Sequence, residues 1–203
     1  MYWLKMSNLA LLLGATAWLS KAPDWEPLLA CIGFLTTFLV QDFRERKKTT
    51  SNQKTLEKDK DNFEEYSDLL SETELLYVLN NDVFNLRTDM GFVKKLGKFI
   101  RRSEQVEGEF HNEKLQKKFS EMVVRLRELK NFLATHFFVP NQGVTTNSDG
   151  EFLLLLYPEL KYSGKAEERE IYQDRQRELQ ELIDAVVNSH DAYRRLVKKQ
   201  LHL

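Results

Sequence analysis

The stretch Ala22-Pro-Asp-Trp-Glu-Pro-Leu-Leu29 decides how this sequence is organised, because it is a short charged hinge between two long apolar runs that carry no charge. The first run is Met6 to Ser20 and the second is Pro27 to Gln41. Beyond Gln41 the chain is polar, and its apolar residues recur at helical spacing. We therefore predict an all-α protein, in which an N-terminal two-helix transmembrane hairpin is followed by a cytosolic antiparallel helical bundle.

The two runs are short for membrane spans. Each is 15 residues long, whereas a span needs about 20 mostly apolar residues and at least about 17. Spans of roughly Tyr2 to Leu19 and Trp25 to Phe43 come near that minimum. Aromatic rings and long basic side chains favour the membrane interface. We expect this interface to include Trp3, Trp18, Trp25, Arg44, Arg46, Lys47 and Lys48.

Two alternatives to a transmembrane hairpin remain open. A signal peptide would use Lys5, the apolar residues Leu9 to Leu13 and a cleavage site at Ala15-Thr-Ala17. A buried helical pair in a soluble protein would also suit short apolar runs. The second run directly after the first disfavours a signal peptide, and the lack of a charged face on either run disfavours a soluble pair.

Basic residues predict the orientation of the hairpin. Arg44, Arg46, Lys47 and Lys48 follow the second run, whereas the hinge offers only Lys21 beside two acidic residues. Basic residues favour the cytoplasmic side of a membrane. With two spans, both termini are then expected in the cytoplasm.

Small residues occur at four-residue spacing in both runs, as Ala10 and Gly14 in the first and as Gly33 and Thr37 in the second. Such pairs let membrane helices approach closely. They either pack the two spans of one chain together or pack spans of different protomers, and we expect a homo-oligomer.

The chain is predicted to have three parts: the transmembrane hairpin at 1–43, a charged linker or exposed helix start at 44–61, and the helical bundle at 62–203. The middle part holds one apolar side chain, Leu56. The formal net charge of −1 gives no global attraction to nucleic acid. The only cysteine, Cys31, cannot form an intramolecular disulfide.

Helix signals define the bundle. Ser71-Glu-Thr-Glu74 is a capping box, Asn112 is a good N-cap, and Asn80-Asn-Asp82 signals a turn. Helices are expected at about Thr88 to Gln105, from Asn112 through His136, and at about Lys165 to Lys199.

The compact apolar run Phe152 to Tyr157 is too short for a span, and its periodicity does not distinguish helix from strand. It either plugs one end of the bundle or forms an interface with a partner or protomer.

No catalytic or cofactor-binding motif is found, so we expect neither an enzyme nor a cofactor. His111, His136, His190 and His202 have no metal-ligand spacing, and His136 and His190 fall in different layers of the bundle, so no metal is expected. The one candidate anion site is a basic stripe that could contact phosphates or remain an ordinary solvated face: Lys94, Lys95, Lys98, Arg101 and Arg102.

The hinge also carries a family resemblance. Trp18-Leu-Ser-Lys-Ala-Pro-Asp-Trp25-Glu-Pro-Leu-Leu, followed by Ile32-Gly-Phe-Leu-Thr-Thr, resembles the N-terminal hairpin of small two-transmembrane effectors of bacterial antiphage defence systems, of the retron-associated or cyclic-oligonucleotide-gated type. The resemblance covers about 45 residues. It implies a bacterial inner-membrane protein that damages the membrane on infection, and it transfers no ligand-binding residue.

Two functions are therefore expected. In the first, the helical domain senses a trigger and the two-span module disrupts the inner membrane; the trigger is a defence-system protein, a nucleic acid or a cyclic oligonucleotide. In the second, the chain is a non-catalytic membrane anchor that recruits a partner protein through the bundle.

Overall fold

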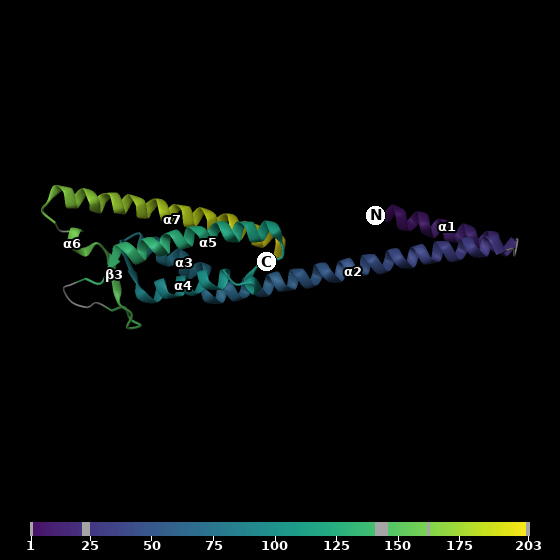
Figure 1. Cartoon of the computed structure of the whole chain (residues 1–203), viewed down its shortest axis with the longest axis horizontal. Coiled ribbons are helices and arrows are strands. Elements are labelled where there is room, and N and C mark those ends of the chain that lie inside the picture. Colours follow the sequence, from purple (N-terminus) through teal and green to yellow (C-terminus); the bar gives the residue numbers. More distant parts are fainter. Residues whose placement is uncertain (1, 22–24, 141–145, 162, 202–203) are drawn as a thin grey trace. The chain divides into compact units, whose positions relative to one another are not determined.

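The structure is a computed structural model that describes residues 2–21, 25–140, 146–161 and 163–201. The chain divides into two compact units, Met1–Thr55 and Leu56–Leu203. Most of the described residues lie in helices (Figure 1), which confirms the predicted helical character. The division between the units lies inside the segment that we interpreted as a linker.

The first unit is a pair of helices, α1 (Tyr2–Lys21) and the N-terminal part of α2 (Trp25–Leu69). The hinge residues 22–24 lie outside the described residues. Helix α2 runs without a break through 44–61, because this segment contains no glycine or proline and is rich in good helix formers. The charged segment is therefore helical, and its last turns belong to the second unit.

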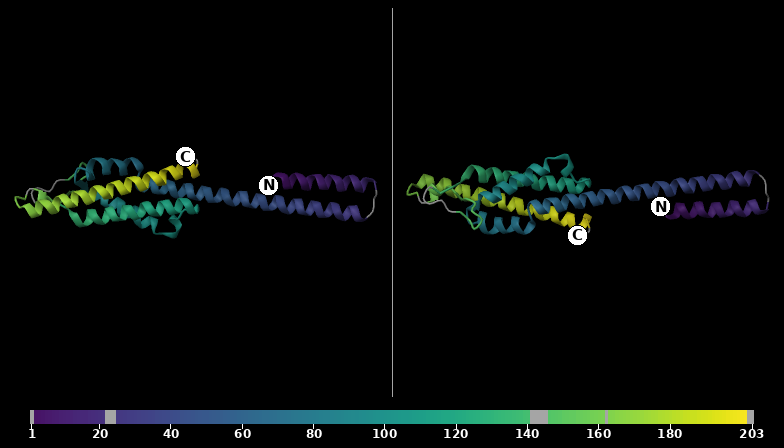
Figure 2. Two further views of the ribbon diagram at one scale, coloured as in Figure 1. Left: turned by 90° about the horizontal axis from the view of Figure 1, so that it is seen from above. Right: turned by 90° about the horizontal axis from the view of Figure 1, so that it is seen from below.

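The second unit is a helical bundle with a small sheet at one end (Figure 1). Its two longest complete helices, α5 and α7, lie side by side in both views of Figure 2. After the end of α2 come α3 (Glu72–Tyr77), the π-helix η1 (Val78–Val83), β1 (Arg87–Asp89), α4 (Met90–Ser103), the 3₁₀ helix η2 (Val106–Gly108), α5 (Glu113–His136), β2 (Phe137–Phe138), β3 (Leu153–Leu156), α6 (Pro158–Lys161) and α7 (Ala166–Leu201).

Side-chain caps fix where three helices begin. Ser71 Oγ accepts a hydrogen bond from Glu74 N at 3.1 Å, and Asn112 Oδ1 accepts from Lys114 N and Leu115 N, which confirms both predicted caps. Asp89 Oδ1 caps α4 in the same way, at 2.8 Å from Phe92 N. These oxygens satisfy amides that have no partner within the helix.

The turn predicted at Asn80-Asn-Asp82 is wrong, because these residues lie inside the π-helix η1. Two of the polar side chains that suggested a turn have partners here: Asn81 Nδ2 donates to Tyr77 O at 2.9 Å, and Asp82 Oδ1 accepts from Arg87 Nε at 3.0 Å. The backbone reverses later, at Leu86, where φ is 62°.

The core forms where the apolar stripes of α5 and α7 meet the shorter helices. The residues that recur at three- and four-residue spacing along these two helices are buried, apart from the half-buried His136: Leu115, Phe119, Met122, Leu126, Leu129 and Leu133 on α5, and Tyr172, Leu179, Ile183, Val186, His190, Tyr193 and Val197 on α7. The ring of Phe119 lies at the centre of an aromatic cluster with Tyr66, Phe110 and Tyr193.

The all-α prediction is incomplete, because the bundle carries a three-stranded antiparallel sheet in the order β1-β3-β2. The central strand β3 comes from the Phe152 to Tyr157 run, and Leu154 pairs with Thr88 while Leu156 pairs with Phe137. Leu154 and Leu156 are buried, whereas Leu153 and Leu155 are half-buried on the other face. One face of the run therefore plugs the bundle end, and the other remains partly accessible.

Candidate functional site

Two of the five cations of the predicted basic stripe hold α4 in the bundle. Lys95 Nζ lies 2.6 Å from Glu74 Oε1, and Arg102 contacts both carboxylate oxygens of Glu65 on α2 at 2.6 and 2.7 Å. Hydrogen bonding to these partners raises the pKa of Lys95 and Arg102 and lowers that of Glu65. The Lys95–Glu74 and Arg102–Glu65 ion pairs therefore have a structural role.

The other three cations face a groove between α4 and α5. Lys94 Nζ pairs with Glu151 at 3.1 Å, whereas Lys98 and Arg101 have no ion-pair or hydrogen-bond partner among the described residues. Arg127 and Lys130 of α5 line the same groove. The stripe predicted on one helix is thus part of a basic surface built by two helices.

The predicted small-residue pairs do not pack the two helices of the hairpin together. Side chains added at Gly14 or Gly33 would meet no atom within 4 Å. Ala10 and Thr37 are exposed, and the Thr37 hydroxyl donates to Gly33 O at 2.8 Å. The small residues therefore lie on the outside of the hairpin, where only contacts with lipid or another molecule can use them.

The predicted interface residues are also exposed where they are described. Trp18 is 49% exposed and Trp25 is 69% exposed. Arg44 and Lys47 are exposed, and Arg46 pairs with Asp42 at 2.7 Å. The side chains of Trp3 and Lys48 lie outside the described part of the structure.

Large apolar side chains cover the surface of the first unit. Those that are 42 to 69% exposed are Met6, Leu9, Leu11, Leu13, Trp18, Trp25, Leu28, Leu29, Ile32, Leu35, Leu39, Val40 and Phe43. A contiguous surface of this kind marks contact with lipid or another protein. Within the described residues, however, no helix combines the length and the apolar character needed to cross a bilayer.

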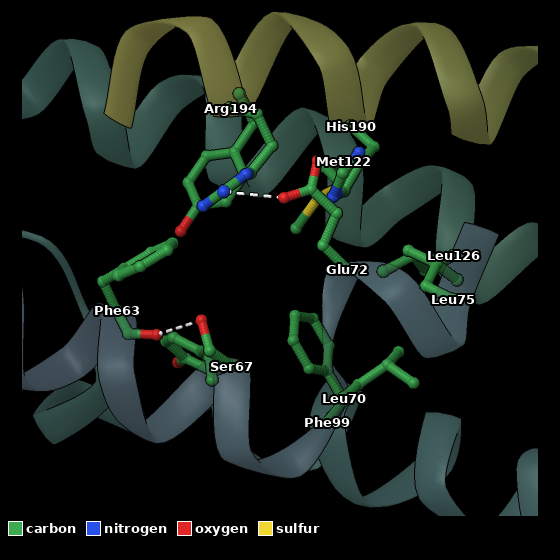
Figure 3. Close-up of a pocket in the computed structure, with 12 residues that line it drawn as sticks. Phe63, Ser67, Leu70, Glu72, Leu75, Phe99, Met122, Leu126, His190 and Arg194 are labelled. Carbon is green, nitrogen blue, oxygen red and sulfur yellow. Dashed lines mark hydrogen bonds and ion pairs between the residues drawn. The ribbon is translucent and has the colours of Figure 1, made fainter. Parts of the chain in front are cut away.

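A small cavity lies in the second unit, between α2, α3, α4, α5 and α7 (Figure 3). Its volume is about 40 Å³, which is enough for about three water molecules. Phe63, Leu70, Phe99 and Met122 form apolar walls. The Tyr193 hydroxyl and His190 Nδ1 are buried at its lining and have no hydrogen-bond partner within the described structure.

Charged groups flank the cavity on the α7 side. Arg194 pairs with Glu72 at 2.6 Å, and its guanidinium carbon lies 5.1 Å from the ring centre of Phe63 (Figure 3). Burial lowers the pKa of His190 and raises that of Tyr193. Both side chains are therefore neutral near pH 7, and the Arg194–Glu72 pair is the charged contact at this site.

Sequence reasoning missed a polar contact between α2 and the segment before α5. Asp59, Asn62 and Tyr66, which we call the α2 clamp, are buried on one face of α2. Asp59 accepts from the backbone amides of His111 and Asn112 at 2.6 and 3.1 Å. Asn62 donates to Glu109 O, and Tyr66 donates to Gly108 O, both at 2.9 Å.

One sequence signal could have revealed this contact. The spacing of three and four residues from Asp59 to Asn62 to Tyr66 places the three side chains on one helix face. The many charged residues around Asp59 made this buried face difficult to recognise in the sequence.

The three described histidines occupy separate environments, and His202 lies outside the described residues. His136 Nδ1 lies 2.6 Å from the Tyr157 hydroxyl, His190 lines the cavity, and His111 contacts Asp59 at 3.4 Å. No group of three or more metal-ligating side chains is present among the described residues.

Comparison with known proteins gives this chain no relative: no family model, no curated protein and no solved structure matches it.

Proposed function

We propose that this chain is a membrane-anchored effector of antiphage defence, in which the helical unit senses a trigger and the α1–α2 hairpin disrupts the bacterial inner membrane. In this proposal the hairpin is embedded in lipid, both termini face the cytoplasm, and the active form is a homo-oligomer. The observation that carries the proposal is the exposure of large apolar side chains over the first unit.

The apolar surface needs a non-aqueous environment. Burying about 1 Å² of such surface is worth about 25 cal/mol, so thirteen exposed large apolar side chains on two helices are costly in water. The uncharged runs are shorter than an ordinary span. A short span is accommodated when the bilayer thins locally, at a cost of fractions of a kcal/mol per Å.

The effector part of the proposal rests on the resemblance of residues 18–37 to two-transmembrane defence effectors. A trigger changes the membrane module only if it binds one assembly state better than another. The outward-facing Gly14 and Gly33 leave room for close contacts between hairpins of different protomers.

Fractionation of cells that express the full chain tests the anchor. We expect the chain to remain in membranes after alkaline carbonate washing and to leave them only with detergent. Cys31, the single thiol, lies in the second apolar run, so a membrane-impermeant maleimide should label it only after detergent is added. A chain that stays in the soluble fraction, with Cys31 labelled at once, contradicts the proposal.

A matched pair of variants separates lipid contact from general loss of solubility. Leu35→Lys places a charge on an exposed position of the hairpin, where a membrane centre penalises lysine by about 3 kcal/mol, and we expect reduced membrane retention. Phe84→Lys makes the same kind of change at an exposed position of the second unit, and retention should be unchanged.

The effector step is tested by dye release. Purified full chain, reconstituted into vesicles that contain a self-quenched dye, should release the dye when the hairpins are crosslinked in pairs through Cys31, the single thiol of each chain. Retention of the dye by crosslinked protein rules out membrane disruption while leaving the anchor intact.

A second function is supported by the exposed face of the sheet. Phe138 is 45% exposed, and Leu155, its pairing partner on the same face, is half-buried together with Leu153. This apolar face suits the recruitment of a partner protein by a passive anchor. Replacing the hairpin with an unrelated two-span anchor distinguishes the two functions, because recruitment survives the exchange and membrane disruption does not.

A further inference from the structure

The groove between α4 and α5 brings together cations from two antiparallel helices. Helix α4 contributes Lys94, Lys98 and Arg101, and α5 contributes Arg127 and Lys130. Arg127 pairs with Glu104 at 2.6 Å, and Lys94 pairs with Glu151 at 3.1 Å. Lys98, Arg101 and Lys130 have no ion-pair or hydrogen-bond partner in the described parts of the chain.

Gly97 lies where the Lys130 side chain of α5 crosses α4. A Cβ atom at Gly97 would lie 3.3 Å from Lys130 Cε, so the lysine side chain passes directly over the glycine. Gly97 shares its helix face with Lys94 and Arg101, which lie three and four residues away. The Lys130 side chain therefore runs beside the cationic row of α4.

Like charges gathered without acidic partners repel one another, and an anion between them removes that repulsion. Among the described lining residues Glu104 is the acidic one, and it pairs with Arg127, while Lys94 pairs with Glu151, which does not line the groove. These two pairs leave the unpaired positive charge of the described groove on three side chains, Lys98, Arg101 and Lys130. The site therefore suits a compact anion.

The lining also indicates which chemical group is recognised. It contains ammonium and guanidinium donors, the Asn131 amide, and the aliphatic side chains of Val93 and Ile100. No aromatic ring lines this part of the described structure, so the groove offers no platform for base stacking. Arginine and lysine are the usual donors to phosphate oxygens.

We propose that Lys98, Arg101 and Lys130 form a binding site for a compact phosphate-bearing anion. This inference deepens the proposed function by assigning the trigger of the helical unit a site and a chemical class, and it rests on that function only for what binding does to the membrane. The phosphate comes either from a soluble ligand or from an anionic lipid headgroup.

Calorimetric titration of the full chain in neutral detergent with inorganic pyrophosphate tests the site directly. We expect saturable binding by the wild type. The triple variant Lys98→Gln, Arg101→Gln, Lys130→Gln should bind about tenfold more weakly or not at all, because it loses charge-assisted hydrogen bonds from three donors. Its unfolding temperature should equal or exceed that of the wild type, because mutual repulsion is removed.

The matched control removes three positive charges elsewhere on the same unit, through Lys114→Gln, Lys117→Gln and Lys199→Gln. These exposed side chains lie outside the groove, so pyrophosphate affinity should stay within about twofold of the wild type, as expected for distant screened charges. Equal losses in the two triple variants, or no saturable binding by the wild type, would overturn the assigned site.

Nanodiscs distinguish the two sources of phosphate. If headgroups occupy the groove, phosphatidylglycerol nanodiscs should weaken pyrophosphate binding relative to phosphatidylcholine nanodiscs, and only for protein with an intact groove. Equal binding in both assigns the site to a soluble ligand. Binding of a single-stranded oligonucleotide much tighter than that of pyrophosphate would replace the compact ligand with a nucleic acid. Dye release is measured separately, so loss of membrane disruption with pyrophosphate binding intact contradicts the proposed function alone.

Discussion

At the scale of single residues, Asp59 shows how one buried carboxylate orders a segment distant in sequence. Its side chain is 2% exposed and accepts two backbone amides at the start of α5. Asn112 caps the same helix from its own side chain. The two residues together satisfy amides that the helix itself leaves without partners.

Replacing Asp59 with alanine should therefore lower the free energy of unfolding by about 2 to 4 kcal/mol, because two amides lose a charged acceptor in a buried place. Chemical denaturation of the full chain in detergent measures the change. Asp68→Ala, at an exposed position on the same helix, is the control and should change stability by less than about 0.5 kcal/mol. Similar values for both variants would show that the α2 clamp contributes little.

His190 makes stability depend on pH. Burial lowers its pKa, with the charges of Glu72, Arg194 and Asp191 acting in smaller and opposing ways. The unfolded chain, in which the pKa is about 6.5, therefore takes up a proton more readily than the folded chain. Stability attributable to His190 is constant above about pH 6.5 and falls as the pH drops through that value towards the folded pKa.

His190→Gln removes this titration while keeping a polar side chain at the cavity. The difference in unfolding midpoint between pH 7.5 and pH 5.5 should be smaller for the variant than for the wild type. His136, whose pKa is also lowered by burial, is present in both proteins and cancels in the comparison. An identical pH dependence would assign the acid sensitivity to other groups.

At the scale of elements, strand β3 combines two roles on its two faces. Leu156 is 1% exposed, whereas Leu153 is half-buried on the opposite face. Leu156→Ala should cost about 2 to 5 kcal/mol of unfolding free energy, the range for truncating a buried leucine. Leu153→Ala should cost less than about 1 kcal/mol, and equal costs would contradict the alternation of faces.

An element can be predicted from the sequence when the residues that determine it are close neighbours in the chain. Helices α5 and α7 follow from apolar spacing and from the cap at Asn112, which involve neighbours within four residues. Strand β3 takes its partners from residues 87–89 and 137–138, and no short-range pattern specifies such pairing. The turn error at Asn80 arose because asparagine also bonds backbone carbonyls within a helix, as Asn81 does here.

The same distinction applies to the candidate site. The cationic residues of α4 were evident from their spacing, but their partners were not. Glu65, Glu74 and Glu151, which neutralise Arg102, Lys95 and Lys94, come from three other segments. Lys130 joins the groove only because α5 packs against α4 at Gly97. The sequence therefore indicated a basic anion site, and tertiary packing determines which cations belong to it.

At the scale of the whole molecule, the described hydrophobic core cluster lies in the second unit, and the first unit buries Ala15. The cluster includes residues from Tyr66 to Leu201, and its flanking apolar side chains begin at Leu56. We expect a fragment of residues 56–203 to fold alone, with helical circular dichroism and a single cooperative unfolding transition. A fragment that lacks helical signal or melts without cooperativity would show that folding requires the hairpin.

The hydrogen bonds of the α2 clamp are made to main-chain atoms, and this determines which substitutions the loop tolerates. A hydrogen bond to a main-chain carbonyl does not depend on the identity of Glu109, so substitutions can accumulate there, whereas the His111 side chain also contacts Asp59 at 3.4 Å. Gly108 is different, since a methyl group at this position would come within 2.3 Å of the Tyr66 hydroxyl and 2.8 Å of Arg102 O. Natural variants should therefore retain Gly108 while position 109 varies. Helix α2 should retain Asp59, Asn62 and Tyr66.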